Sequence, residues 1–224
     1  MRNPFSSLNK FEWGLYILSL SLVTLSYALS QGGLLSFIAS LIGVTALIFV
    51  AKGDVFGQVI TVIFALFYAY ISLKFKYYGE MITYIGMTAP MAVMAVVSWV
   101  RNPYNGTREV KVARLRPYHF VWVSVMTEIV PAVFYFILAA LDTPNLFFST
   151  ISVTTSFYAS ALTFLRSPYY ALAYAANDVV LIVLWVLASI TDISYLPMII
   201  CFVAFLINDI YGFINWTKMK NRQS

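Results

Sequence analysis

Charged residues are scarce in this chain: 10% of its 224 residues are Asp, Glu, Lys or Arg, whereas soluble domains average about 25%. It has one histidine, His119, which excludes metal sites built from several histidines. Its one cysteine, Cys201, excludes an intrachain disulfide framework. With 61% hydrophobic residues and a mean hydropathy of +0.83, the composition indicates a membrane protein.

Eight apolar runs are long enough to cross a membrane, because a hydrocarbon core about 30 Å thick needs roughly 17–25 helical residues. They cover residues 13–30, 34–51, 55–73, 80–100, 118–140, 145–165, 169–190 and 195–217. The connectors are short, apart from a basic loop at 101–117. The sequence therefore predicts an all-α polytopic membrane protein with about eight transmembrane helices.

The basic residues indicate the orientation of these spans. All 14 Lys and Arg residues lie in connectors or tails. With both termini in the cytoplasm, 12 of them fall inside, and only Lys74 and Lys76 fall outside. Such a bias is typical of plasma-membrane proteins with this topology, so the net charge of +5 is explained without a nucleic-acid partner.

A weak internal repeat groups the second to fourth spans and the sixth to eighth spans. The last helix of each group ends alike, with "SWVR" at 98–101 and "NWTK" at 215–218, which sets Trp99 on Trp216. Both groups begin outside, so they are parallel, and the fifth span is a linker. In transporters with such repeats the substrate site lies near the membrane midplane. The predicted parts are a tail and extra helix (1–32), a first three-helix repeat (33–100), a basic loop and linker helix (101–141), a second repeat (142–217) and a basic tail (218–224).

Three acids lie inside predicted spans, namely Glu128, Asp178 and Asp209. An ionisable group there costs about 2.5–3.5 kcal/mol on insertion scales and usually faces a cavity or a partner. No Lys or Arg lies inside a span to pair with them. They are therefore protonated, bound to neutral donors, hydrated or facing a cationic ligand. We interpret Glu128, which lies on the linker helix, as structural.

The last span carries its acid on a helix face with other distinctive residues. Asp209, Gly212 and Trp216 follow one another at i, i+3 and i+7, and Asn208 lies on an overlapping face. We expect Gly212 to leave room beside the acid and Trp216 to close a pocket toward the cytoplasm. The alternative is a helix-packing seam, with Trp216 in the interfacial aromatic belt.

The seventh span repeats the pattern, with Asn177 beside Asp178 and with Tyr174 and Trp185 near the same line. Two Asn–Asp pairs in equivalent units favour polar faces that converge on one cavity. The predicted substrate-binding residues are Asn208, Asp209, Trp216, Asn177, Asp178, Tyr174 and Trp185 in the second repeat, with Gln58, Tyr68, Thr88 and Trp99 in the first. No catalytic, metal-binding or cofactor-binding set is predicted.

The residues of this site limit the ligand. A phosphorylated substrate requires Arg or Lys nearby, and the spans contain neither. Unless a basic loop residue such as Arg101 or Lys218 reaches the site, the substrate is therefore expected to be neutral or cationic. A flat aromatic ring bearing hydroxyl groups would stack on Tyr and Trp, and a cationic ring would gain further from cation–π contact. No ATP-binding loop is present.

Three segments resemble the Pnu family of vitamin-precursor transporters: "YAYISLKFKYYGEM" (68–81), "WVRNPYNGTREVKVARL" (99–115) and "NDIYGFINW" (208–216). The resemblance covers essentially the whole chain. It implies two three-helix repeats around a linker helix and facilitated diffusion of nicotinamide riboside, drawn inward by cytosolic phosphorylation. The family carries tryptophans ahead of an Asn or Asp in the seventh span. This chain keeps Asp178 but has Ala171 and Tyr174 at the tryptophan positions.

Other functions stay open at this point. Members of the family carry thiamine, riboflavin or deoxynucleosides, and these ligands are alternatives. A second alternative is the substrate-binding subunit of an ATP-driven vitamin importer. A membrane-embedded enzyme that uses Asp178 or Asp209 as acid or base ranks low, because no nucleophile–base pair accompanies them. Proton coupling and assembly as a homo-oligomer are also left open.

Overall fold

The computed structural model describes residues 3–30, 34–74, 78–143, 145–191 and 196–224. After a 3-10 turn at Pro4–Ser7, the helices are α1 (Lys10–Ser30), α2 (Leu34–Ala51), α3 (Val55–Lys74), α4 (Tyr78–Thr83), α5 (Ala89–Val100), α6 (Pro117–Ala140), α7 (Leu146–Phe164), α8 (Tyr170–Thr191) and α9 (Leu196–Arg222). A π-helical segment, Tyr84–Thr88, joins α4 to α5. The described helices therefore occupy all eight predicted spans.

Six helical stretches in the described residues are long and apolar enough to cross a membrane. Of the other two predicted spans, α2 contributes a shorter apolar stretch, Phe37–Ala51, and α7 is rich in Ser and Thr. The prediction of an all-α polytopic membrane protein is confirmed.

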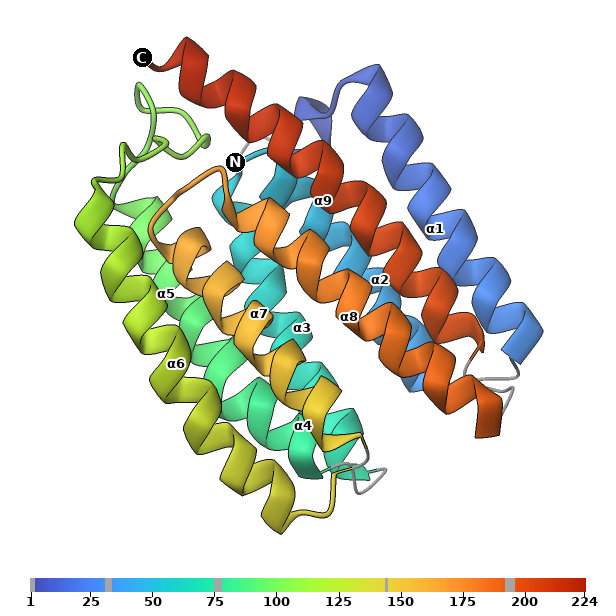
Figure 1. Cartoon of the computed structure of the whole chain (residues 1–224). Helices are drawn as coiled ribbons and strands as arrows, with labels where there is room; N and C mark the ends of the chain where they lie inside the picture. The colour runs from blue at the N-terminus through green and yellow to red at the C-terminus, as the bar shows by residue number, and fades with distance from the viewer. Residues whose placement is uncertain (1–2, 31–33, 75–77, 144, 192–195) are drawn as a thin grey trace.

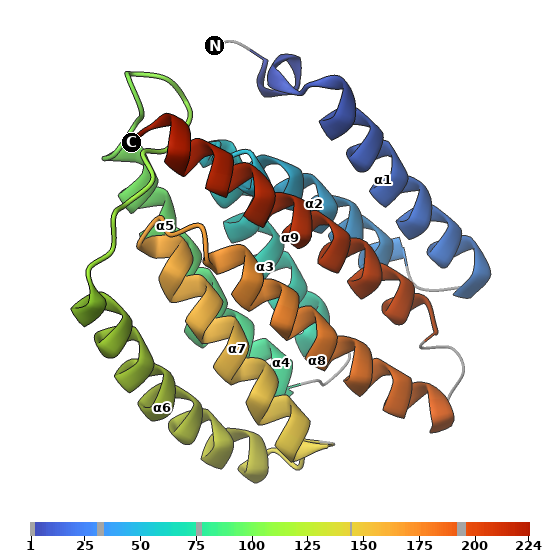
Figure 2. The same ribbon diagram turned by 45° about the horizontal axis from the view of Figure 1, so that its top comes forward.

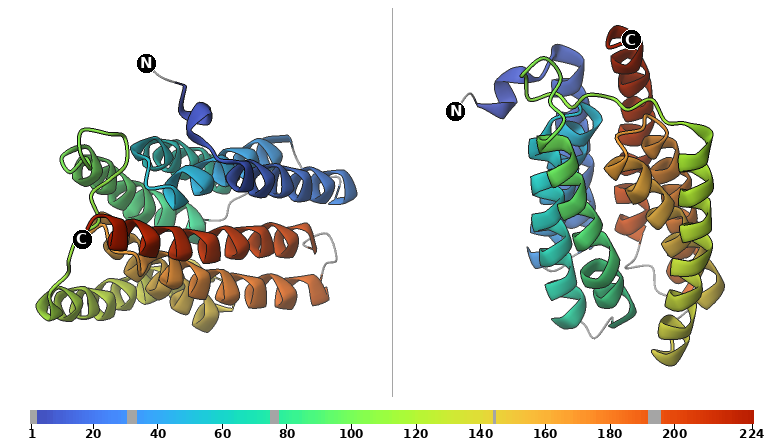
Figure 3. Two further views of the ribbon diagram at one scale, coloured as in Figure 1. Left: turned by 90° about the horizontal axis from the view of Figure 1, so that it is seen from above. Right: turned by 90° about the vertical axis from the view of Figure 1, so that its left-hand side faces the viewer.

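The helices run alongside one another in two layers (Figure 1). Helices α1 to α5 form one layer and α6 to α9 the other, as the two views of Figure 3 show. Figure 2 shows α9 lying between α8 and α1, and α9 also contacts α2 in the first layer. Both termini and the loop between α5 and α6 lie at the same end of the bundle.

The extra helix α1 is attached to this bundle by buried polar contacts. Glu12 is 1% exposed, and its carboxylate accepts from Lys52 Nζ at 2.9 Å and from the Tyr211 hydroxyl at 2.8 Å. Lys52 follows α2 and Tyr211 belongs to α9, so one carboxylate holds three helices together. Our sequence-based search for buried acids missed Glu12, because it lies just before the predicted first span.

Two tryptophans link the layers in matching ways. The indole N–H of Trp99, at the end of α5, donates to the Thr163 carbonyl in α7 at 3.0 Å. The indole N–H of Trp216, near the end of α9, donates to the Val50 carbonyl in α2, also at 3.0 Å. Each tryptophan thus binds the C-terminal end of the first helix of the other three-helix unit.

The residues before the tryptophans repeat this exchange. Ser98 Oγ donates to the Phe164 carbonyl at 2.8 Å, and Asn215 Nδ2 donates to the Ala51 carbonyl at 3.0 Å. Helix ends have unpaired carbonyls that side chains can satisfy, which explains why both pairs lie there. These matching contacts support our proposal of two repeats at 33–100 and 142–217.

The turns that follow α2 and α7 also correspond. Gly53 and Arg166 have positive φ angles of 72° and 58°. The carbonyl of Gly53 accepts from the Val110 amide at 2.9 Å, and that of Arg166 accepts from the Ala113 amide at 3.0 Å. The loop between α5 and α6 therefore joins both turns at the end of the bundle that carries the termini.

The rod that combines α4 and α5 is irregular at its centre. Pro90 has no N–H, so it cannot donate to the carbonyl of Gly86 four residues earlier. The chain adopts a π-helical turn there, and the Ala89 amide donates to the Tyr84 carbonyl. The extra residue in this turn shifts the register of the side chains on α5 relative to those on α4.

Candidate functional site

Two carboxyl groups from neighbouring helices meet in the interior. Asp178 of α8 and Asp209 of α9 lie within hydrogen-bonding reach of each other and are 4% and 5% exposed. Both groups are acceptors when ionised, so a hydrogen bond between them requires a proton on one of the two. The structure therefore brings together the two acids that the sequence singled out in the second repeat.

The carboxyl pair receives few hydrogen bonds from neutral donors around it. The Asp178 Oδ2 atom is buried and has no hydrogen-bond partner. The hydroxyl of Tyr174 is bonded to Ser160 at 2.9 Å, and the hydroxyl of Tyr170 donates to the Val50 carbonyl at 3.3 Å. The nearby tyrosines are thus bonded elsewhere, and one carboxylate oxygen is left for a proton or a ligand.

The neighbour of each acid faces a different helix. Asn177 Oδ1 accepts from Ser152 Oγ at 3.2 Å and from Thr155 Oγ1 at 2.8 Å, and both donors belong to α7. The Ser/Thr-rich helix α7 therefore supplies hydrogen bonds to α8. The structure places Asn177 in the contact between these two helices, one position away from the carboxyl pair.

Asn208 is oriented toward α1. Its Nδ2 donates to Ser19 Oγ at 2.8 Å and to the Ala204 carbonyl at 2.8 Å, and it is 1% exposed. Consecutive helical residues point about 100° apart. Asn208 therefore faces α1 while Asp209 faces α8, and the structure separates two residues that the sequence grouped in one site.

The space beside Gly212 is occupied by neighbouring helices. A Cβ atom at Gly212 would lie 3.2 Å from the Tyr170 hydroxyl oxygen and 3.5 Å from the Cβ atoms of Ala171 and Ala51. The glycine thus allows α8 and α2 to approach α9 closely, as a packing seam requires. The expectation that Gly212 leaves room for a ligand is corrected by these contacts.

Trp216 and Trp99 pack together in the core. Both are 0% exposed, and their ring centroids lie 5.2 Å apart. Tyr170 adds an edge contact to Trp216 at 4.9 Å. This burial places Trp216 in the core rather than in an interfacial aromatic belt. The three rings fill the bundle between the two layers near the end that carries the termini.

The remaining predicted residues lie on α3, on the π-helical segment and on α8. The rings of Tyr68 in α3 and Tyr84 in the π-helical segment lie 4.5 Å apart. Gln58 is buried in α3, Thr88 is half-buried in the π-helical segment, and Trp185 is half-buried in α8. The eleven predicted residues thus occupy several places, and their assignment to one ligand site stays a prediction.

Tyr170 is a residue that our sequence analysis did not select. It is 1% exposed and contacts Trp216, the Val50 carbonyl and the space beside Gly212. Its position four residues before Tyr174, on the same helix face, was a signal that could have identified it.

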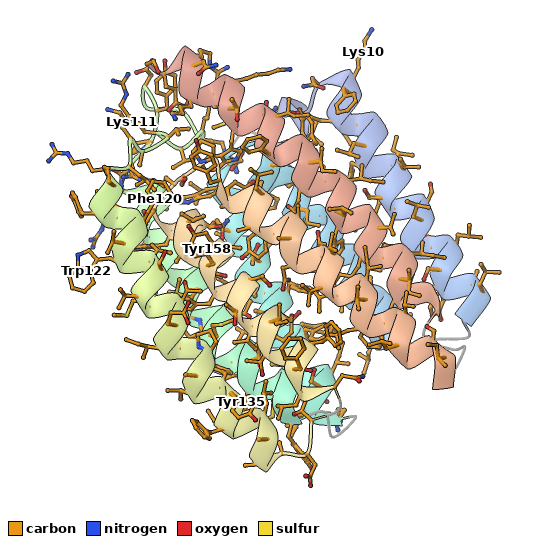
Figure 4. All side chains as sticks on the ribbon, in the orientation of Figure 1. Lys10, Lys111, Phe120, Trp122, Tyr135 and Tyr158 are labelled. Carbon is orange, nitrogen blue, oxygen red and sulfur yellow. The ribbon has the colours of Figure 1, made fainter. Side chains whose placement is uncertain are left out.

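Ion pairs outside the carboxyl pair lie at the end of the bundle that carries the termini. The ion pairs among the described residues are Lys52–Glu12, Arg108–Asp54 and Arg222–Glu109, and none includes Asp178 or Asp209. Figure 4 shows Lys10 and Lys111 at the same end, whereas Trp122 extends outward from α6. The described part of the chain has no group of three or more metal-ligating side chains.

A bundle of membrane-spanning helices in matching three-helix units, with a carboxyl pair buried between two helices, is the architecture of a polytopic membrane transporter. The chain belongs to the family described as "Nicotinamide mononucleotide transporter", whose model matches residues 33–218. This confirms the expected family and a transporter rather than an enzyme. The helix α1 precedes the matched region.

Named relatives agree with this assignment. The chain is 26% identical over 228 residues to the nicotinamide riboside transporter PnuC of Neisseria mucosa, covering 100% of this chain and 87% of the relative. It is 25% identical to the protein of the same name from Haemophilus influenzae, covering 88% and 85%. A crystal structure of the vitamin B3 transporter PnuC superposes with a TM-score of 0.81 at 25% identity, covering 97% of this chain and 95% of that one.

Proposed function

We propose that this protein carries nicotinamide riboside, an unphosphorylated vitamin precursor, across the plasma membrane by facilitated diffusion, and that cytosolic phosphorylation traps it. The family description refers to the mononucleotide, whereas the relatives are named for the riboside. These two molecules differ by one phosphate group. Within this chain, the distribution of basic residues discriminates between them.

The observation that carries this proposal is the absence of Lys and Arg from the predicted spans that contain Asp178 and Asp209. All Lys and Arg residues lie in connectors, in tails or at helix ends, and Asp178 and Asp209 would repel a phosphate. The riboside has an N-alkylated pyridine ring with a permanent positive charge, and its ribose hydroxyls are hydrogen-bond donors. A carboxyl pair among tyrosines suits such a ligand.

We infer that the termini lie in the cytoplasm. The loop between α5 and α6, the turns after α2 and α7 and the C-terminal tail carry most of the basic residues, and they share one end of the bundle. Cytoplasmic loops of membrane proteins are enriched in Lys and Arg, which supports this orientation.

Uptake into proteoliposomes tests the proposal. Vesicles with the purified protein should take up labelled nicotinamide riboside saturably and only to equilibrium, and should exclude the mononucleotide. Enclosing a riboside kinase with ATP should convert this equilibration into accumulation of label. Ligand binding without any transport would indicate instead the substrate subunit of an ATP-driven importer. Uptake of the mononucleotide alone would contradict our proposal.

Thiamine is a second candidate because of one structural observation. Ala171 stands where the resemblance to the Pnu family places a tryptophan. It is 0% exposed and lies where α8 closely approaches α9 at Gly212. A tryptophan would not fit there, so the ligand contacts differ from the family pattern. Thiamine also has a cationic ring, and excess unlabelled thiamine should be tested as a competitor of riboside uptake.

A further inference from the structure

The carboxyl pair has a property that the proposed transport alone does not require. Two ionised carboxylates in contact repel each other strongly, so such pairs share one proton. Asp178 and Asp209 are in this situation at low exposure. No described Lys or Arg forms an ion pair with either carboxyl group, so a shared proton is the way to neutralise one of the two.

We propose that the Asp178–Asp209 pair holds one proton in the ligand-free carrier and releases it when a cationic ring binds beside the pair. The inference rests on the proposed function, because it concerns the same ligand. Binding then exchanges one positive charge for another, and the proton passes to the surrounding water. The Oδ2 atom of Asp178 has no hydrogen-bond partner, and in this proposal it is the carboxylate oxygen that faces the cationic ring.

Among the described residues that surround the pair, no other group titrates near neutral pH. The titratable residues that face it are Tyr170 and Tyr174 on α8 and Cys201 on α9. Phenol and thiol groups are neutral at neutral pH. Among the helices packed against α8 and α9, α2 has no titratable residue and α7 has Tyr158 alone.

The charged groups of α1 are also accounted for. Glu12 is bonded to Lys52 and to the Tyr211 hydroxyl, and Lys10 is exposed at the end of the bundle. A proton released on ligand binding therefore comes from the pair. The sign of the pH effect follows, since a ligand that displaces a proton binds more tightly as the pH rises.

Calorimetry of the purified full chain measures this exchange. Nicotinamide riboside is titrated at one pH in two buffers that differ in ionisation enthalpy, and the difference in observed heat gives the number of protons released. We expect about one proton per ligand and, on the acidic side, an affinity that rises about tenfold per pH unit. Binding with equal heats in both buffers overturns the inference and leaves the proposed function intact.

A neutral ligand of the same shape provides the matched control. Dihydronicotinamide riboside has the same ribose and carboxamide but an uncharged ring. We expect it to bind at least about tenfold more weakly, because it lacks the charge that faces the pair, and to release no proton. Equal proton release by both ligands would overturn the exchange. If neither the riboside nor thiamine binds, the proposed function fails and the inference fails with it.

Two variants locate the proton. Asp209→Asn leaves one carboxyl group with an amide donor beside it, so a shared proton is no longer needed, and we expect weaker binding without proton release. Asp142→Asn removes an exposed acid in the connector between α6 and α7 and should preserve the release. Release that survives in Asp209→Asn would overturn the assignment.

Infrared spectroscopy detects the loss of the shared proton in the wild-type protein. The carbonyl stretch of a protonated carboxyl group should be present in the ligand-free wild-type protein and should disappear when the riboside binds. Persistence of this band in the bound state would contradict the proposal, even if Asp209→Asn failed to fold.

Discussion

The indole rings of Trp99 and Trp216 lie 5.2 Å apart at an interplanar angle of 52°, and each indole donates a hydrogen bond to the opposite three-helix unit. The two residues lie near the C-terminal ends of α5 and α9, the last helices of the two units. Their contact therefore joins both units near the end of the bundle where the turns with Lys52 and Arg166 lie. These matching hydrogen bonds are the contacts that most directly support the predicted internal repeat.

Replacing either tryptophan by alanine should destabilise the protein. We expect Trp99→Ala and Trp216→Ala each to lower the free energy of unfolding by about 3–5 kcal/mol, because each leaves a large cavity in the core. The double variant should lose less than the sum by about 0.5–1.5 kcal/mol, the usual coupling of an aromatic pair. Denaturation in detergent measures both effects. Trp122→Ala, which truncates a 64% exposed side chain, is the control, and strict additivity would contradict the coupling.

Asn208 and Asp209 should respond differently to substitution, although they are adjacent. Asp209→Asn should weaken riboside binding about tenfold, because it removes a charge beside the cation. Asn208→Ala should leave affinity unchanged and lower stability by about 1–3 kcal/mol, since the Ser19 hydroxyl loses its buried partner. Binding and thermal denaturation of both variants decide the sequence-based prediction that Asn208 also contacts the ligand, which a loss of affinity in Asn208→Ala would support.

Two helical glycines should show opposite effects when changed to alanine. A Cβ at Gly57 would lie 2.4 Å from the Val50 amide nitrogen, whereas a Cβ at Gly14 meets no atom within 4 Å. Gly57→Ala must therefore push α3 away from α2 and should cost several kcal/mol, as overpacking does (about 1–3 kcal/mol or more). Gly14→Ala should stabilise α1 by about 0.5–1 kcal/mol. Melting temperatures that fall equally for both would argue against this packing.

Loss of Lys52 alone should destabilise the protein more than loss of both charges of the Glu12–Lys52 ion pair. Lys52→Met leaves the 1% exposed carboxylate of Glu12 without its cation, and removing one partner of a buried pair typically costs about 3–5 kcal/mol. Adding Glu12→Gln should recover much of this loss, because the uncompensated charge is gone. Chemical denaturation of the single and double variants tests this order. A double variant less stable than Lys52→Met would contradict it.

The sequence by itself determined the helices and predicted their orientation. Apolar runs of bilayer length and basic connectors depend on composition alone, because a membrane requires each span to satisfy its own backbone. The same reasoning identified Asp178 and Asp209, since unpaired acids are rare in such runs. It also aligned Trp99 with Trp216 as equivalent positions, because the two predicted repeats end in similar residues.

Only the tertiary structure decided which neighbour each polar side chain meets. Asn177 faces α7, Asn208 faces α1, and the two acids between them face each other. A helical sequence gives the angle between adjacent side chains, but the helix that lies in each direction is set by packing across the whole bundle. For the same reason the sequence suggested space beside Gly212, where the fold places Tyr170, Ala171 and Ala51.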